Sequence, residues 1–242
     1  MLAKIRKAFE RFGFQPMETP ALEYAETLTG KYGAEEKLMY RFADAGGREV
    51  AMRYDLTVPL ARFYSANKNE LPKPFKRYQI GPVWRAENTQ KGRFREFYQC
   101  DVDCVGSDSP LADAEVIAAV SAALKDLGID KTVTRINNRR IIDGILLLSG
   151  VSEEKWILVM RELDKLDKVG AEAVKQQLEA GGVGAAHVKK LFEFINADVF
   201  SAGGLQDFFD QAAKENKTLA EGIGELSDVL KALAALGVKN TV

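Results

Sequence analysis

The chain has 242 residues, a formal net charge of −1, 46% hydrophobic residues and 29% charged residues, values typical of a soluble globular protein with one large or two small domains. No stretch approaches the ~20 apolar residues that a membrane span needs, and the N-terminus lacks the apolar core of a signal peptide. A nearly neutral chain has no broad field to attract nucleic acid, so any RNA contact must come from local patches, such as the 91–95 loop, or from a segment not present here. We expect a cytoplasmic protein with no membrane contact.

Histidine and cysteine are too sparse to carry the chemistry. His187 is the only histidine, which excludes a zinc site of the usual ligands and a histidine-based triad; we expect it to be a surface or packing residue of a helix. Cys100 and Cys104 lie four residues apart on one strand, about 13 Å at strand rise, too far for a disulfide. The chemistry must therefore use Arg, Asp, Glu and Gln.

The N-terminal segment mixes a helix with short strands. Apolar residues recur at helical spacing over 3–12, and Gly13 is placed to end that helix. A turn is expected at Gly46 and Gly47. The predicted strands or extended segments of this part are 14–20, 36–42 and 48–55.

Two helices of the first half of the chain carry start signals. One is predicted to begin near Thr57, with Thr57 as N-cap and Pro59 tolerated in the first turn. The other has Ser109 as N-cap, Pro110 at its first position and Gly128 at its end.

Residues 76–104 predict a hairpin with one polar face. Side chains alternate across a strand, so Gln99, Asp101 and Asp103 share a face, and Arg85 and Glu87 share a parity before the loop. The loop adds Lys91, Arg93 and Arg95 around Gly92. Alternation of this kind is usually the solvated face of an antiparallel sheet. Carboxylates beside guanidinium groups favour instead a site for a small zwitterion and a polyphosphate.

The sequence pattern changes after Gly150, from mixed helices and strands to helices. A strand over 131–137 and a helix from Arg139 are predicted first, and only helices follow. We therefore expect an α+β core over residues 1–149, a helical insertion over 150–236, and a return to the core sheet from 237–242. The predicted helices of the insertion are 152–167, 171–180, 185–196, 204–214 and 218–236.

Three segments, in order, resemble a known enzyme family. "GPVWRAE", "QKGRFREFYQ" and "DVD" within residues 78–106 resemble motif 2 of the class II aminoacyl-tRNA synthetases, and of histidyl-tRNA synthetases in particular. "MRYDLTVPLAR" (52–62) is similar to that family's histidine- and ATP-site segment, and "FGFQPMETPALE" (12–23) to motif 1. The resemblance implies an antiparallel sheet flanked by helices, followed by a helical insertion.

For the ATP site, the resemblance implies four residues. Arg85 matches the motif 2 arginine that contacts the α-phosphate, and Arg93 matches a contact to the outer phosphates. Glu87 matches the residue that reads the adenine amino group, and Phe97 matches the ring that stacks on adenine. Gln90 matches a loop position near the tRNA acceptor end.

For the amino-acid site, the resemblance implies another four residues. Asp55 and Thr57 match contacts to the amino group and backbone of histidine. Gln99 and Asp103 match the pair that holds the ammonium and carboxylate end of the substrate.

The family forms histidyl-adenylate from histidine and ATP with Mg²⁺, transfers histidine to tRNA(His), and dimerises through motif 1. The family's motif 3, its second histidine signature and its anticodon-binding domain do not occur in these 242 residues. We therefore expect an N-terminal portion of such an enzyme, weak or inactive in adenylation by itself. Two alternatives stay open: a histidine-sensing regulatory subunit of ATP phosphoribosyltransferase, and a non-catalytic fragment acting in dimerisation.

Overall fold

The computed structural model describes residues 1–29, 38–196, 214 and 216–238. The chain divides into two compact units. Unit 1 comprises Met1–Val133 and Ala232–Asn240, and unit 2 comprises Thr134–Lys231 and Thr241–Val242. Among the described residues, no helix is both long and apolar enough to cross a bilayer.

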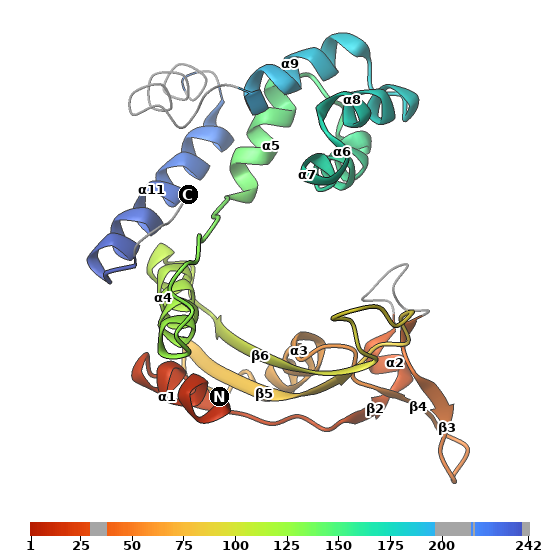
Figure 1. Ribbon diagram of the computed structural model, residues 1–242, viewed down its shortest axis with the longest axis vertical. Helices are drawn as coiled ribbons and strands as arrows, with labels where there is room; N and C mark the ends of the chain where they lie inside the picture. The colour runs from red at the N-terminus through yellow and green to blue at the C-terminus, as the bar shows by residue number, and fades with distance from the viewer. Residues whose placement is uncertain (30–37, 197–213, 215, 239–242) are drawn as a thin grey trace. The chain divides into compact units, whose positions relative to one another are not determined.

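The long hairpin of unit 1 is the element that carries the polar face. Strands β5 (Phe75–Trp84) and β6 (Glu96–Val105) pair antiparallel along their whole length, from Phe75↔Val105 to Trp84↔Glu96. Strand β1 (Gln15–Pro16) pairs parallel with β5, which gives the order β1-β5-β6. Figure 1 shows β5 and β6 running side by side in unit 1. The predicted hairpin is confirmed.

One face of this hairpin packs against two helices. Helix α1 (Leu2–Arg11) and helix α4 (Pro110–Asp126) bury apolar side chains against the even-numbered positions of the strands. The Ser109 side chain accepts a hydrogen bond from Leu111 N at 3.3 Å, so the predicted N-cap of α4 is confirmed. The cluster contains Ile5, Ala8, Phe9, Phe14, Tyr78, Ala119 and Ala123, with Ile80, Val102 and Cys104 packed against it.

A second, smaller sheet precedes the hairpin in the chain. Strands β2 (Leu22–Tyr24), β4 (Glu49–Met52) and β3 (Arg41–Ala43) form an antiparallel sheet in the order β2-β4-β3. Helix α2 (Ala25–Leu28) follows β2. The predicted strand over 36–42 is wrong for residues 38–40, which are not extended, while residues 36 and 37 lie outside the described residues. The predicted extended segment 14–20 contributes only β1.

Helix α3 (Thr57–Asn67) begins where the sequence predicts, but a different side chain caps it. The Asp55 Oδ1 atom accepts hydrogen bonds from the backbone N–H groups of Thr57 and Val58, both at 3.0 Å. Thr57 is the first helical residue, and its predicted role as N-cap is wrong. A carboxylate two residues earlier satisfies the free N–H groups of the first turn, as short polar side chains do at helix starts.

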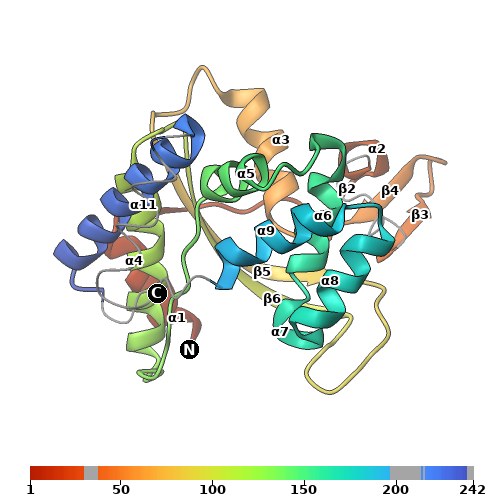
Figure 2. The same ribbon diagram turned by 90° about the horizontal axis from the view of Figure 1, so that it is seen from above.

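Unit 2 is helical in its described part. The predicted helices 171–180 and 185–196 are confirmed at both ends, whereas 152–167 is divided into η2, α6 and α7. The predicted helix 204–214 lies outside the described residues except at its last position. Figures 1 and 2 both show α6, α7 and α8 gathered beside α9. The elements are α5 (Arg139–Leu148), η2 (Glu153–Lys155), α6 (Trp156–Leu163), α7 (Leu166–Val169), α8 (Ala171–Ala180), α9 (Ala185–Asn196) and α11 (Lys217–Ala235).

The predicted strand over 131–137 is wrong. Thr134 alone occupies a bridge position there, and Val133 is 64% exposed. Helix α5 starts at Arg139 as predicted, and the Asn138 side chain caps it by accepting from Arg140 N at 2.8 Å. Helix α5 belongs to unit 2. The predicted boundary between a core over 1–149 and an insertion over 150–236 stays a prediction.

Two helices of unit 2 approach closely through glycines. A Cβ atom at Gly144 of α5 would lie 2.7 Å from the Cβ of Leu219, and one at Gly222 of α11 would lie 2.8 Å from Ile141 N. Both distances are too short for an added methyl group. Leu219 and Ile141 are themselves buried against each other, so this contact depends on the absence of side chains.

Candidate functional site

The face of the hairpin opposite the two helices carries the odd-numbered side chains. The pairing places Arg77 opposite Asp103, Gln79 opposite Asp101, and Gly81 opposite Gln99. Arg77 is 0% exposed and Gln79 is 1% exposed. A solvated sheet face does not bury an arginine and a glutamine. The interpretation of this face as an ordinary water-exposed surface is therefore wrong at Arg77 and Gln79.

Arg77 and Asp103 form an ion pair within this face. The Arg77 Nη2 atom lies 2.9 Å from Asp103 Oδ2 and donates a hydrogen bond to the Leu56 carbonyl at 3.0 Å. Burial raises the pKa of Asp103, an effect that the Arg77 guanidinium opposes and the nearby Asp55 carboxylate reinforces. Burial likewise raises the pKa of Asp101, again against the charge of Arg77. The guanidinium therefore balances carboxylates that water reaches poorly.

A second buried arginine supports the middle of β5. Arg53, 6% exposed, donates from Nε to the Pro82 carbonyl at 2.9 Å and from Nη1 to the Thr19 carbonyl. A Cβ at Gly81 would lie 2.8 Å from Arg53 Nη2. Glycine at this position thus lets the guanidinium pass beneath the strand.

Arg85 is fixed at the end of the hairpin by two aromatic rings. Its Cζ atom lies 4.3 Å from the centroid of the Tyr54 ring and 5.1 Å from that of Phe97. Its Nε atom donates to the Tyr54 carbonyl at 3.2 Å, and its backbone N–H donates to the Arg95 carbonyl at 2.9 Å. The negative faces of aromatic rings attract a guanidinium placed over them. Arg85 is therefore oriented before any ligand arrives.

Arg85 and Glu87 lie beyond the end of β5, which closes at Trp84. The expectation that strand alternation places them on one face is therefore wrong, because the segment from residue 85 to residue 89 is not extended sheet. In this segment Glu87 pairs with Arg93 at 3.2 Å, and the Glu87 carbonyl accepts from Arg95 Nε at 3.3 Å. The loop is thus closed by contacts between its own two limbs.

The tip of the loop is a tight turn. Gln90 and Arg93 form an isolated antiparallel bridge, and Gly92 has a φ of +80°. A positive φ of this size favours glycine, which explains Gly92 in the run "QKGR". Lys91 is exposed, and Phe94 is 69% exposed. The loop therefore presents its cationic and aromatic side chains to solvent.

Three buried polar atoms of the site have no hydrogen-bond partner: Arg77 Nε, Gln99 Oε1 and Asp103 Oδ2, the last of which is nevertheless ion-paired with Arg77 Nη2 at 2.9 Å. All three belong to the odd-numbered face described above. Buried polar atoms without partners are rare in proteins and costly to keep. Their concentration on one face indicates a surface built to receive a polar ligand.

The predicted site residues fall into three groups. Arg85 and Phe97 touch each other, and Glu87 touches Arg93, with Gln90 bridged to Arg93 at the tip of the same loop. Asp103 and Gln99 lie on the odd-numbered face of β6. Asp55 and Thr57 meet at the start of α3. Their individual roles stay predictions.

Sequence reasoning missed Arg77 and Tyr54 as members of the site. Arg77 shares its parity with Gly81 and Val83 on β5, so extending the alternation backwards from the loop could have found it. Tyr54 lies 31 residues before Arg85 in the sequence, and no local sequence pattern predicts a contact over that separation. Asp101 was placed on the polar face but given no role.

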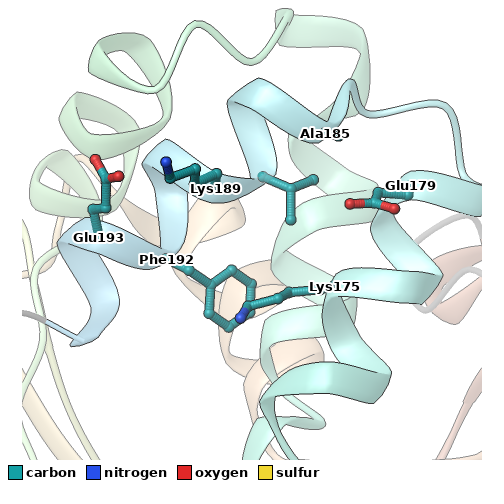
Figure 3. A pocket seen from close by; sticks show the side chains of 7 residues that line it. Lys175, Glu179, Ala185, Lys189, Phe192 and Glu193 are labelled. Carbon is teal, nitrogen blue, oxygen red and sulfur yellow. The ribbon is translucent and has the colours of Figure 1, made fainter.

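Two hollows among the described residues of unit 2 are unlike this site. One, of about 330 Å³, lies between α8 and α9, where the Lys175 ammonium stands 5.1 Å from the centroid of the Phe192 ring (Figure 3). The other, of about 700 Å³, is mainly apolar and is lined by residues of α5, α6 and α9. Neither combines buried carboxylates with guanidinium groups. The smaller hollow is lined by Lys175, Glu179, Ala185, Val188, Lys189, Phe192 and Glu193.

Comparisons with known proteins agree with the geometry. A family model of histidyl-tRNA synthetases matches residues 1–242. A histidine–tRNA ligase of Helicobacter hepaticus is 44% identical over 98% of the chain and 54% of its own length. One of Aeropyrum pernix is 48% identical over 81% of the chain and 45% of its own length. The chain thus spans about half the length of the curated relatives that it matches.

Solved structures show the same fold. A histidyl-tRNA synthetase from a Nostoc species superposes with a TM-score of 0.86 at 32% identity, over 100% of the chain and 55% of its own. A Bacillus halodurans protein described as an ATP phosphoribosyltransferase regulatory subunit or histidyl-tRNA synthetase gives 0.82 at 20% identity, over 99% of the chain and 61% of its own, which shows the fold alone. The α+β fold, a class II synthetase sheet with flanking helices, is confirmed. The chain belongs to the histidyl-tRNA synthetase family.

Proposed function

We propose that the protein containing this chain is a histidine–tRNA ligase, which activates histidine with ATP and transfers it to tRNA(His). The observation that carries the proposal is the fixed Arg85 guanidinium at the end of a polar sheet face. The rings of Tyr54 and Phe97 hold it, and the half-buried carboxylates Asp101 and Asp103 belong to the same hairpin. A phosphate-binding cation beside a zwitterion-binding face is what amino-acid activation requires.

At the nucleotide end, Arg85 acts on the α-phosphate. The carboxylate oxygen of histidine attacks the α-phosphorus, the bond from that phosphorus to the bridging oxygen breaks, and pyrophosphate leaves. Negative charge grows on the α-phosphate oxygens during this step, and a preorganised guanidinium stabilises it. Phe97 offers its ring to adenine, Glu87 its carboxylate to the adenine amino group, and Arg93 its charge to the outer phosphates.

At the amino-acid end, Asp55, Thr57, Gln99 and Asp103 receive histidine. Gln99 Oε1, which lacks a hydrogen-bond partner, and the Asp103 carboxylate, which is ion-paired with Arg77, suit the ammonium group, which donates three hydrogen bonds and accepts none. The buried carboxylate charge favours a cation over a neutral group.

Magnesium, tRNA and a second subunit complete the proposal. The residues that the structure describes contain no group of three or more His, Cys, Asp or Glu that could hold a metal ion, so no residue is assigned to Mg²⁺. When bound with ATP, Mg²⁺ would neutralise phosphate charge. Gln90, at the tip of the loop, is proposed to lie near the acceptor end of tRNA. We further propose a cytoplasmic homodimer formed through the motif 1 segment, 12–23.

Histidine-dependent exchange of labelled pyrophosphate into ATP tests the activity in the intact protein. We expect exchange with histidine and none with the other amino acids. Exchange that is absent with every amino acid, from protein that binds ATP, contradicts the proposal.

The alternative is a regulatory protein that binds histidine without activating it. Such a protein has no need of the phosphate and adenine contacts, yet Arg85, Glu87, Arg93 and Phe97 are all present. Arg85 contacts Tyr54 and Phe97, and Glu87 pairs with Arg93. Tight binding of histidine with no exchange would favour the regulatory function.

A further inference from the structure

Arg77 is a buried cation to which the proposed reaction assigns no task. Its side chain is fully buried, although guanidinium groups are almost never fully buried without partners. It lies on β5, opposite Asp103 on β6. The cost of removing this charge from water calls for an explanation from the site that surrounds it.

The charged groups that face Arg77 come from two elements. Asp101 and Asp103 project from β6, and Asp55 precedes α3; all three attract the guanidinium, with Asp103 the strongest. Arg85 also acts on Asp101 from the far end of the hairpin, more weakly than Arg77. One buried cation therefore stands among three carboxylates.

One ion pair and one hydrogen bond fix the direction of the Arg77 side chain. Nη2 reaches both the Asp103 carboxylate, at 2.9 Å, and the Leu56 carbonyl, at 3.0 Å. Leu56 lies between Asp55 and Thr57, which hold the start of α3. The same nitrogen therefore ties β6 to the start of α3, and these two elements supply the four proposed histidine contacts.

We propose that Arg77 is a positioning residue of the amino-acid site: it keeps Asp103 ionised and oriented toward the substrate while touching no substrate atom itself. The inference rests on the proposed function, since it takes histidine as the ligand of this face. Without Arg77, three carboxylates would face one another with no cation among them, and like charges disfavour ionisation.

The expected signature is a change in the pH dependence of histidine binding. Burial already raises the pKa of Asp103, and Arg77 opposes that rise. Removing the positive charge raises the pKa further, so histidine binding is lost at a higher pH as the solution is acidified. A neighbouring charge shifts a pKa by about 1 to 3 units. We call the part of the pH profile in which histidine binding is lost on acidification the acid limb, and we expect it to move to higher pH by about that amount.

The test compares Arg77→Gln with Arg77→Lys in the intact protein. Gln keeps a donor for the Leu56 carbonyl but carries no charge, whereas Lys keeps the charge and loses the planar fork. Calorimetric titration with histidine from roughly pH 5 to pH 8 gives the dissociation constant, which rises about tenfold for each unit of limb shift. We expect the limb to shift in Arg77→Gln and to stay near the parent position in Arg77→Lys.

A purely structural role predicts a different result. It lowers the melting temperature of both variants and moves the acid limb of neither, and that outcome would overturn the proposal. Arg53→Gln serves as the matched control, because Arg53 is also buried and bonded to carbonyls but is not among the groups that act on Asp103. Its limb should not move.

If Arg77→Gln does not fold, Asp101→Asn tests the same electrostatics with the opposite sign, because the Asp103 charge raises the pKa of Asp101 and repulsion between two carboxylates is mutual. Removing one carboxylate relieves the repulsion and should move the limb to lower pH; a limb that stays in place would count against the proposal. Failure of the proposed function is separate, since it appears as missing pyrophosphate exchange in the parent protein. The binding assay gives its answer whether or not exchange occurs.

Discussion

At the residue scale, the site depends on a few charged side chains held by neighbours of different kinds. Arg85 is held by rings and a backbone carbonyl, whereas Arg77 is held by a carboxylate and a backbone carbonyl. Arg77 lies on the odd-numbered face of β5, whereas Arg85 follows the end of that strand. Their substitution should affect different substrates.

Arg85→Lys should lower the rate of adenylate formation by about 10²–10³, the usual cost of losing one preorganised donor. Lysine keeps the charge but cannot lie flat between the rings of Tyr54 and Phe97. Single-turnover formation of adenylate by the intact protein measures the effect. Arg48→Lys, at an exposed turn paired with Asp44, is the control; an Arg85→Lys enzyme with the parent rate would remove Arg85 from the reaction.

Asp103→Asn should weaken histidine binding more than ATP binding. The change removes the carboxylate that faces the ammonium, and a hydrogen bond to a charged group contributes about 1.5–3 kcal/mol, or roughly a tenfold to hundredfold change in the dissociation constant. Separate titrations with histidine and ATP measure the two affinities. Asp126→Asn, which removes a carboxylate from a pair with Arg11, should change neither. Equal losses for both ligands in Asp103→Asn would point to misfolding instead.

At the element scale, the helices of unit 2 depend on close approach as much as on apolar stripes. Gly222 of α11 faces the backbone of α5, whereas Gly224 of the same helix has nothing within 4 Å of a built Cβ. These two glycines therefore offer a matched pair in one helix. The same substitution should have opposite signs at the two positions.

Gly222→Ala should destabilise the protein by about 1–3 kcal/mol, the usual cost of overpacking, because its Cβ would meet Ile141 N at 2.8 Å and Arg140 Cβ at 2.9 Å. Gly224→Ala should stabilise it by up to about 1 kcal/mol through helix propensity. Urea unfolding gives both values. Equal stabilisation by the two substitutions would mean that α5 and α11 are not in contact.

Elements with strong local signals could be predicted from the sequence. Helices α8 and α9 have apolar stripes, α8 lies between Gly170 and Gly181, and α9 follows Gly184; the predicted ends of both helices agree with the observed ones. The segment 131–137 has β-branched residues but gains no ladder there beyond Thr134; strand propensity depends on a partner that local sequence does not reveal. The cap of α3 was misplaced because Asp55 and Thr57 are both good capping residues.

The residues of the candidate site also differ in whether local sequence predicts their positions. The polar face of β6 follows from alternation, which the ten-pair register preserves. The position of Arg85 over the rings of Tyr54 and Phe97 could not be predicted, because the segment that carries Arg85 is neither strand nor helix. The alternation of β5 places Arg77 on the polar face. No sequence motif, however, distinguishes a charged residue at that position as part of a site.

At the scale of the whole molecule, the described site residues all belong to unit 1 and the helical core belongs to unit 2. Chemistry and helical packing are thus carried by different residues. Damage to the core of unit 2 should therefore reduce stability before it reduces ligand affinity.

Leu178→Ala should cost about 2–5 kcal/mol, as for other buried leucines, because Leu178 is 0% exposed in the core of unit 2. Below the melting temperature, the dissociation constant for ATP should stay at the parent value. Calorimetric melting and ATP titration measure the two effects. Ile157→Ala, at a side chain 77% exposed, is the control, and a large loss of ATP affinity in folded Leu178→Ala would contradict the separation.

The ten-pair register of β5 and β6 has a consequence for how chain length can vary in this protein. Adding or deleting one residue within either strand reverses the faces beyond that point, which would turn Asp103 or Arg77 toward the apolar cluster of α1 and α4. The same change at the tip of the connecting loop, near Lys91 and Gly92, leaves every strand position on its own face. Natural or engineered length variation should therefore accumulate in that loop, while the strands accept exchange of residues but not a change in their number.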